Sequence, residues 1–119
     1  MGQYLYDDAA KAFEEVLAVA PDLADARMNL AIALFNRNRK EDLAAAEELL
    51  ARVLDAEPGN VRALYFQAIL LQHAGNAEAA IPCLVRVVEQ RPDDGAAWYL
   101  LALCKQRVGQ PAEEEFLRA

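Results

Sequence analysis

The chain has 119 residues, of which 55% are hydrophobic, 26% charged and 8% aromatic, a composition typical of a folded domain rather than a disordered segment. Its net charge of −7 is unfavourable for binding nucleic acid or an anionic membrane surface, because both of these are negatively charged. The sequence contains no Ser and no Thr, which excludes Ser and Thr nucleophiles, phosphorylation at those residues and N-glycosylation.

The distribution of Ala, Gly and Pro indicates a chain built of helices. Ala occurs 25 times, whereas Gly and Pro occur five times each. Between the Gly and Pro residues, apolar residues recur at helical spacing. In chain order, the sequence predicts seven helices over residues 6–20, 22–36, 42–56, 61–74, 77–90, 95–108 and 111–118.

The ends of these helices are marked by Asp, Asn and Gly. Because Ser and Thr are absent, N-capping falls to the short side chains that remain, and Gly suits the end of a helix. The basic stretch Arg37-Asn38-Arg39-Lys40 is expected to be a solvated loop, with a local anion contact as the alternative. The expected N-caps are Asp22, Asn60, Asn76 and Asp94, and the expected helix-ending glycines are Gly75 and Gly109.

A small–large–small pattern recurs along the chain. Its members follow the spacing i, i+4, i+7, which places them on one helix face where small side chains let a neighbouring helix come close. Pro21, Pro58 and Pro92 follow three of the copies. The rows are Ala9, Phe13 and Val16; Ala46, Leu50 and Val53; Ala80, Leu84 and Val87; and Ala112, Phe116 and Ala119.

A second pattern, exemplified by Trp98…Leu101-Ala102, precedes these rows, and together they resemble the tetratricopeptide repeat family. The resemblance implies an all-α solenoid of helix-turn-helix units, wound as a right-handed superhelix whose first helices line the concave side. It divides residues 1–119, as a single array, into the second helix of a partial repeat, two repeats and a final partial repeat. These segments span 6–21, 22–58, 59–92 and 93–119, and the chain is expected to be an excerpt of a longer protein.

Each first helix carries a further row of large side chains beside its packing row. An amphipathic helix needs only one apolar face for packing, so the additional row predicts a groove that binds a peptide or a helix. Arg62 is expected at the rim, where it could contact a ligand carboxylate. The expected groove residues are Met28, Ile32, Phe35, Arg62, Tyr65, Ile69, Gln72, Tyr99, Leu103 and Gln106.

The sequence therefore favours a protein-interaction scaffold that binds an apolar peptide or helix segment in the concave groove. The alternative is a purely structural, spacer or self-associating array without a groove ligand, in which other parts of the parent protein cover the second row. Such an array could form a homo-oligomer through exposed terminal repeats. The identity of the protein or peptide partner is not encoded in the sequence.

Catalysis, a cofactor and a metal site are not expected. Cys83 and Cys104 form no CxxC motif, and His73 is the only His, which falls short of the ligands of a structural zinc site. Both cysteines are expected to be buried free thiols. The N-terminal residues show no signal-peptide pattern, and no apolar run approaches the roughly 18 residues of a membrane span, so a cytoplasmic location without membrane insertion is favoured.

Overall fold

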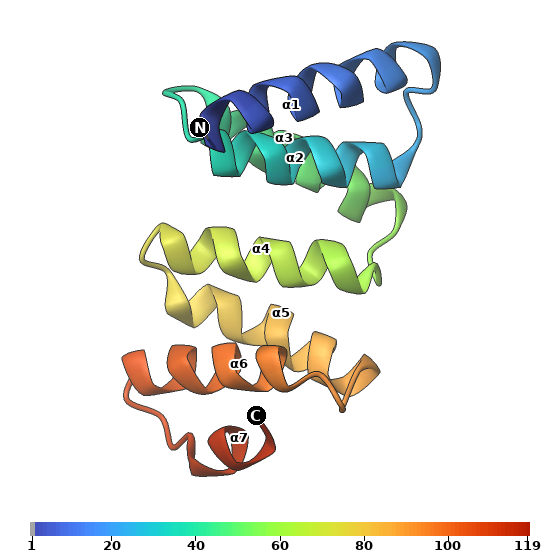
Figure 1. The fold of residues 1–119 in the computed structure, drawn as a ribbon. Coiled ribbons are helices and arrows are strands. Elements are labelled where there is room, and N and C mark those ends of the chain that lie inside the picture. Colours follow the sequence, from blue (N-terminus) through green and yellow to red (C-terminus); the bar gives the residue numbers. More distant parts are fainter. Residues whose placement is uncertain (1) are drawn as a thin grey trace. The chain divides into compact units, whose positions relative to one another are not determined.

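The computed structural model describes residues 2–119, and their side chains from residue 6 onward. This part of the chain forms seven helices and no strand, which confirms the predicted all-α fold (Figure 1). It comprises two compact units, unit 1 ending at Pro58 and unit 2 beginning at Gly59. The helices are α1 (Gly2–Val19), α2 (Ala24–Arg37), α3 (Asp42–Ala56), α4 (Val61–His73), α5 (Ala77–Gln90), α6 (Gly95–Arg107) and α7 (Glu113–Arg118).

The helix ends lie within two residues of the predicted ends, except at the start of α1. This helix begins at Gly2 rather than at residue 6, because neither Gly nor Pro interrupts the sequence between Gly2 and Pro21. Pro82 lies inside α5, and the helix continues through it to Gln90.

Three of the four predicted N-caps are confirmed. The side chains of Asn60, Asn76 and Asp94 accept hydrogen bonds from the backbone N–H groups three residues later, at 3.0, 3.3 and 3.1 Å. The prediction of Asp22 as an N-cap is wrong. Helix α2 begins at Ala24, so Leu23 occupies the N-cap position, and its side chain makes no capping hydrogen bond. Asp22 instead lies exposed, with its carboxylate 3.6 Å from the largely buried guanidinium of Arg27.

The glycines act as predicted at the ends of α4 and α6. Gly75 and Gly109 have φ values of 84° and 78°, a left-handed conformation that a residue with a Cβ rarely adopts. At the end of α2 the same conformation is adopted by Asn38, with a φ of 56°. Asn tolerates this conformation better than most residues with a side chain.

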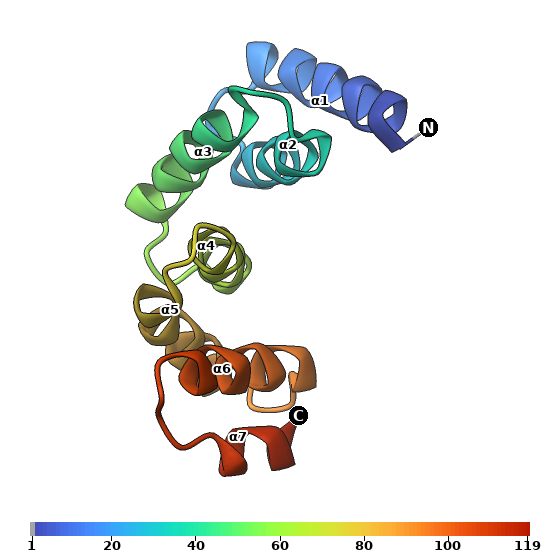
Figure 2. The same ribbon diagram turned by 90° about the vertical axis from the view of Figure 1, so that its left-hand side faces the viewer.

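In unit 1, α2 packs against both α1 and α3, as the end-on view of α2 in Figure 2 illustrates. The predicted packing row of α3, Ala46, Leu50 and Val53, is buried. The corresponding row of α1 is not, because Val16 is 42% exposed, and among the described side chains of this helix only Ala10 is buried. The inward face of α1 is therefore centred one residue later than the pattern predicts.

The turn between α2 and α3 is exposed at Asn38, Arg39 and Lys40, as expected for a solvated loop, and ion pairs also organise it. The guanidinium of Arg37 donates from Nε and Nη2 to the Asp42 carboxylate at 2.9 and 2.8 Å. Its Nη1 atom donates to Asp7 at 3.0 Å, and Arg39 reaches the same Asp7 carboxylate at 2.6 Å. The side chains of Arg37 and Asp42 are only 17% and 7% exposed. The anions that meet this basic stretch are thus carboxylates of the same chain.

In unit 2, α5 packs against α4 and α6, and α7 packs against α6. The predicted packing row of α5, Ala80, Leu84 and Val87, is fully buried. The last row is more open, since Ala112 is buried, Phe116 is partly buried and Ala119 is exposed.

Polar and aromatic contacts attach α7 to α6. Lys105 Nζ lies 2.8 Å from Glu115 Oε2, and both side chains are largely buried. The Arg118 guanidinium lies over the Trp98 ring, 5.2 Å from its centroid, and the Trp98 indole N–H donates to the Pro92 carbonyl at 2.8 Å. The short α7 is therefore held by an ion pair and a cation–π contact in addition to apolar packing.

Candidate functional site

The predicted groove residues of unit 1 are not all on the surface. Met28 is 1% exposed and therefore belongs to the core, so its prediction as a surface contact is wrong. Ile32 and Phe35, which follow it at helical spacing, are partly buried and offer part of their surface. The sequence spacing identified residues that share a face of α2, but it did not indicate which of them the neighbouring helices cover.

In unit 2, the first helix α4 carries Tyr65, Ile69 and Gln72, all partly buried, while Arg62 in its first turn is exposed. Arg62 and Tyr65 line a recess of about 230 Å³ whose other walls come from α5, from the α5–α6 turn and from the start of α6. Ile69 and Gln72 do not line this recess. Its lining is Val61, Arg62, Tyr65, Val87, Arg91, Asp94 and Ala96.

The electrostatics of this recess are mixed. Burial raises the pKa of the Tyr65 hydroxyl, and the negative charge of Asp94 raises it further, so the phenol stays protonated at neutral pH and can donate a hydrogen bond. Asp94 itself accepts the N–H of Ala97 as the cap of α6. Arg62 and Arg91 are both exposed. The recess thus combines apolar walls with one hydroxyl donor, one carboxylate and two cationic side chains.

The row on α6 is the most exposed of the three. Tyr99 is 52% exposed, Leu103 is partly buried and Gln106 is exposed. One side of the Tyr99 ring meets the edge of Phe116 from α7, with the ring centroids 5.9 Å apart and the planes at 68°. Tyr99 is therefore shared between packing against α7 and the surface, and it does not line the recess at Tyr65.

Five residues of the recess were missed by the sequence reasoning. Val87 was assigned to the packing row, where its burial places it, yet it also forms the recess wall. Ala96 precedes Tyr99 by three positions and so shares its helix face, a signal that could have been used. Val61, Arg91 and Asp94 lie at helix ends or in a turn, where periodicity carries no information about facing.

The groups with potential for catalysis or metal binding are scattered. Cys104 is buried and Cys83 is partly buried with its thiol 3.3 Å from Gln67 Oε1, and both are free. Burial raises the pKa of each thiol. His73 is exposed in the last turn of α4. Within the described part of the chain, no group of three or more His, Cys, Asp and Glu is placed to hold a metal ion.

Comparison with known families identifies the repeat. The tetratricopeptide repeat profile matches residues 39–104, more than half of the chain, and a second profile of the same description matches residues 2–42. Among curated proteins, none matches this sequence. Among the described residues, no helix is both long enough and apolar enough to cross a membrane.

Solved structures of MamA have a similar fold. One crystal structure of MamA superimposes with a TM-score of 0.82 at 20% identity, covering 96% of this chain and 66% of its own. Another reaches 0.78 at 19% identity, covering 96% of this chain and 60% of its own. The chain thus spans less than two thirds of the length of these proteins. At such identities the similarity establishes the fold alone.

Proposed function

Because the chain belongs to the tetratricopeptide repeat family, we propose that it binds an apolar segment of a partner protein at the recess around Tyr65. Protein–protein interaction is the function that this fold supports in general. The finer proposal rests on one observation, the recess of about 230 Å³ between α4, α5 and the start of α6. It contains a predicted groove residue, Tyr65, at its wall.

The lining of the recess favours a protein segment over a small charged ligand. Val61 and Ala96 supply apolar surface, and the Tyr65 ring adds a large apolar area with few torsions to restrict on binding. The Tyr65 hydroxyl, protonated at neutral pH, can donate to a backbone carbonyl of the segment. A ligand that buries about 100 Å² of apolar surface here gains about 2.5 kcal/mol before ordering costs, which is consistent with weak and reversible binding.

The proposal is tested by selecting short peptides against the whole chain from a displayed random library and measuring the affinity of the selected peptide by fluorescence polarisation. Ala96→Leu fills the recess from an exposed position, so it should weaken binding by about fivefold or more without disturbing the core. Tyr65→Ala should weaken binding to a similar extent, because it removes the largest wall of the recess.

Ala74→Leu is the matched control, since Ala74 is an exposed residue of unit 2 outside the recess. It should leave the affinity unchanged, and circular dichroism should show equal helix content in all three variants. If peptides bind equally to wild type, Ala96→Leu and Tyr65→Ala, the recess is not the binding surface. That result would favour the alternative of a structural array without a groove ligand.

A further inference from the structure

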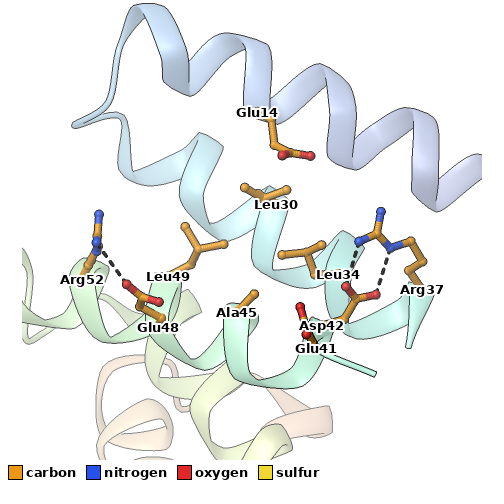
Figure 3. Close-up of a pocket in the computed structure, with 10 residues that line it drawn as sticks. All are labelled: Glu14, Leu30, Leu34, Arg37, Glu41, Asp42, Ala45, Glu48, Leu49 and Arg52. Carbon is orange, nitrogen blue, oxygen red and sulfur yellow. Dashed lines mark hydrogen bonds and ion pairs between the residues drawn. The ribbon is translucent and has the colours of Figure 1, made fainter. Parts of the chain in front are cut away.

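A second recess lies in unit 1, between α1 and α3 above the side chains of α2 (Figure 3). Its volume is about 400 Å³, within the range of about 300–1,000 Å³ typical of ligand pockets. Leu30 and Leu34 of α2 form its floor, and Ala45 and Leu49 of α3 form one wall. The centre of the recess is therefore apolar.

This recess faces away from the predicted groove row of α2. Leu30 stands two positions after Met28, and Leu34 stands two positions after Ile32. Two positions in an α-helix correspond to roughly 200° of rotation, so the leucines and the groove row lie on opposite sides of α2. The unit 1 recess is thus distinct from the groove that the repeat pattern predicts.

Carboxylates dominate the rim of the recess. Glu14 of α1, Glu48 of α3 and Glu41, which directly precedes α3, line it. Its two cationic side chains already have partners within the chain: Arg37 is held by Asp42, and Arg52 lies 3.1 Å from Glu48. No ion pair of the described residues includes Glu14 or Glu41.

The surrounding unit carries most of the acidity of the chain. Residues 1–58 contain 12 Asp and Glu against 6 Lys and Arg, whereas residues 59–119 contain 7 against 6. The negative potential of unit 1 therefore attracts cationic groups toward this recess and repels phosphates.

We propose that the unit 1 recess docks a basic, apolar segment of a partner protein, in which Leu-like side chains alternate with Arg or Lys. The apolar side chains would contact Leu30, Leu34 and Leu49, and the cationic groups would pair with Glu14 and Glu41 at the rim. Arg suits this position because its guanidinium binds carboxylates through paired hydrogen bonds while its stem packs on apolar surface. An acidic segment or a nucleic acid is disfavoured by the same carboxylates.

The test uses the whole chain and a short fluorescein-labelled peptide of alternating Arg and Leu, titrated by fluorescence polarisation. A second peptide carries citrulline in place of Arg, which keeps the shape of the side chain and removes its charge. We expect the citrulline peptide to bind about tenfold more weakly, and binding of the Arg peptide to weaken as salt rises from about 0.05 M to about 0.3 M.

Neighbouring glutamates provide a matched pair of variants. Glu14→Gln/Glu41→Gln removes the two rim charges that form no ion pair within the described residues, and it should weaken binding by about threefold or more. Glu15→Gln/Glu47→Gln removes the same charge from exposed positions of α1 and α3 that do not line the recess, and it should have little effect. Ala45→Leu, which fills the recess, should also weaken binding, whereas Ala96→Leu in unit 2 should not.

Each contrary result overturns the proposal in a defined way. Equal binding of the citrulline and Arg peptides would exclude recognition by charge. If the two double Glu→Gln variants lost the same amount of affinity, the attraction would come from the overall charge of unit 1 and not from the rim of the recess. Binding that Ala45→Leu leaves unchanged would exclude the recess as its location. The unit 2 proposal is independent of all these results, because it depends on Ala96 and Tyr65.

Discussion

Replacing Asp42 with Ala should destabilise unit 1 selectively. The Asp42 carboxylate accepts two hydrogen bonds from the Arg37 guanidinium, at 2.9 and 2.8 Å, and one from the Arg39 backbone N–H at 2.9 Å. Removing one partner of a buried ion pair costs about 3–5 kcal/mol, because the other charge stays buried. Asp7 still binds Arg37 in the variant, at 3.0 Å. The expected loss in the free energy of unfolding is therefore smaller, about 2–4 kcal/mol.

Hydrogen–deuterium exchange followed by mass spectrometry measures this effect unit by unit. Amides of α2 and α3 should exchange faster in Asp42→Ala, by a factor of about 30 or more for the lower bound of 2 kcal/mol, whereas amides of α5 and α6 should be unchanged. Urea denaturation followed by circular dichroism should show a matching fall in the stability of the chain.

Asp55→Ala is the control, since Asp55 is an exposed carboxylate in the same helix. It should leave the exchange of α2 and α3 nearly unchanged. The reasoning is refuted if the two variants exchange alike, because the three hydrogen bonds to Asp42 would then contribute no more than a solvated surface carboxylate does. Uniform acceleration in both units would refute the assignment of the effect to unit 1.

Two further predictions concern capping and acid. Asn60→Ala should lower the free energy of unfolding by about 1 kcal/mol, because it removes the cap on α4, whereas Asp22→Ala should not change it measurably in urea denaturation; equal losses would contradict the assigned helix starts. Hydrogen bonds from Arg37 and Lys105 lower the pKa values of the Asp42 and Glu115 carboxyls. These hydrogen bonds therefore stabilise the folded state above about pH 4, where the carboxyls of the unfolded chain are ionised. The stabilisation is lost as the pH falls through the lowered pKa values of the folded state. In melting curves from about pH 7 to about pH 2, Asp42→Asn/Glu115→Gln should lose less stability than wild type, and parallel losses would contradict the assignment.

The helices were predictable because their signals are local. Caps at Asn60, Asn76 and Asp94 depend on contacts over three residues, and the packing rows depend on spacing within one helix. The failure at Asp22 is equally local: the helix starts two residues later than its nearest capping residue, so a suitable side chain alone did not fix the boundary.

The candidate sites were less predictable, because they depend on contacts between helices. The pairing of Arg37 with Asp7 joins residues 30 positions apart, and no motif marks it in the sequence. Likewise, Met28 follows the same spacing as Ile32 and Phe35 but is fully covered, which only the neighbouring elements determine. Spacing assigned Tyr65 to a helix face, but the walls of its recess come from α5 and α6.

The only Trp of the sequence is Trp98, and it lies in unit 2 beneath Arg118 of α7. Its indole N–H is bonded to the Pro92 carbonyl, and the cation–π contact disappears when α7 leaves α6. Its emission is therefore an intrinsic optical signal for the C-terminal part of the fold, whereas far-ultraviolet dichroism sums over all the helices. Recording both signals in one titration separates the melting of residues 59–119 from that of the chain as a whole.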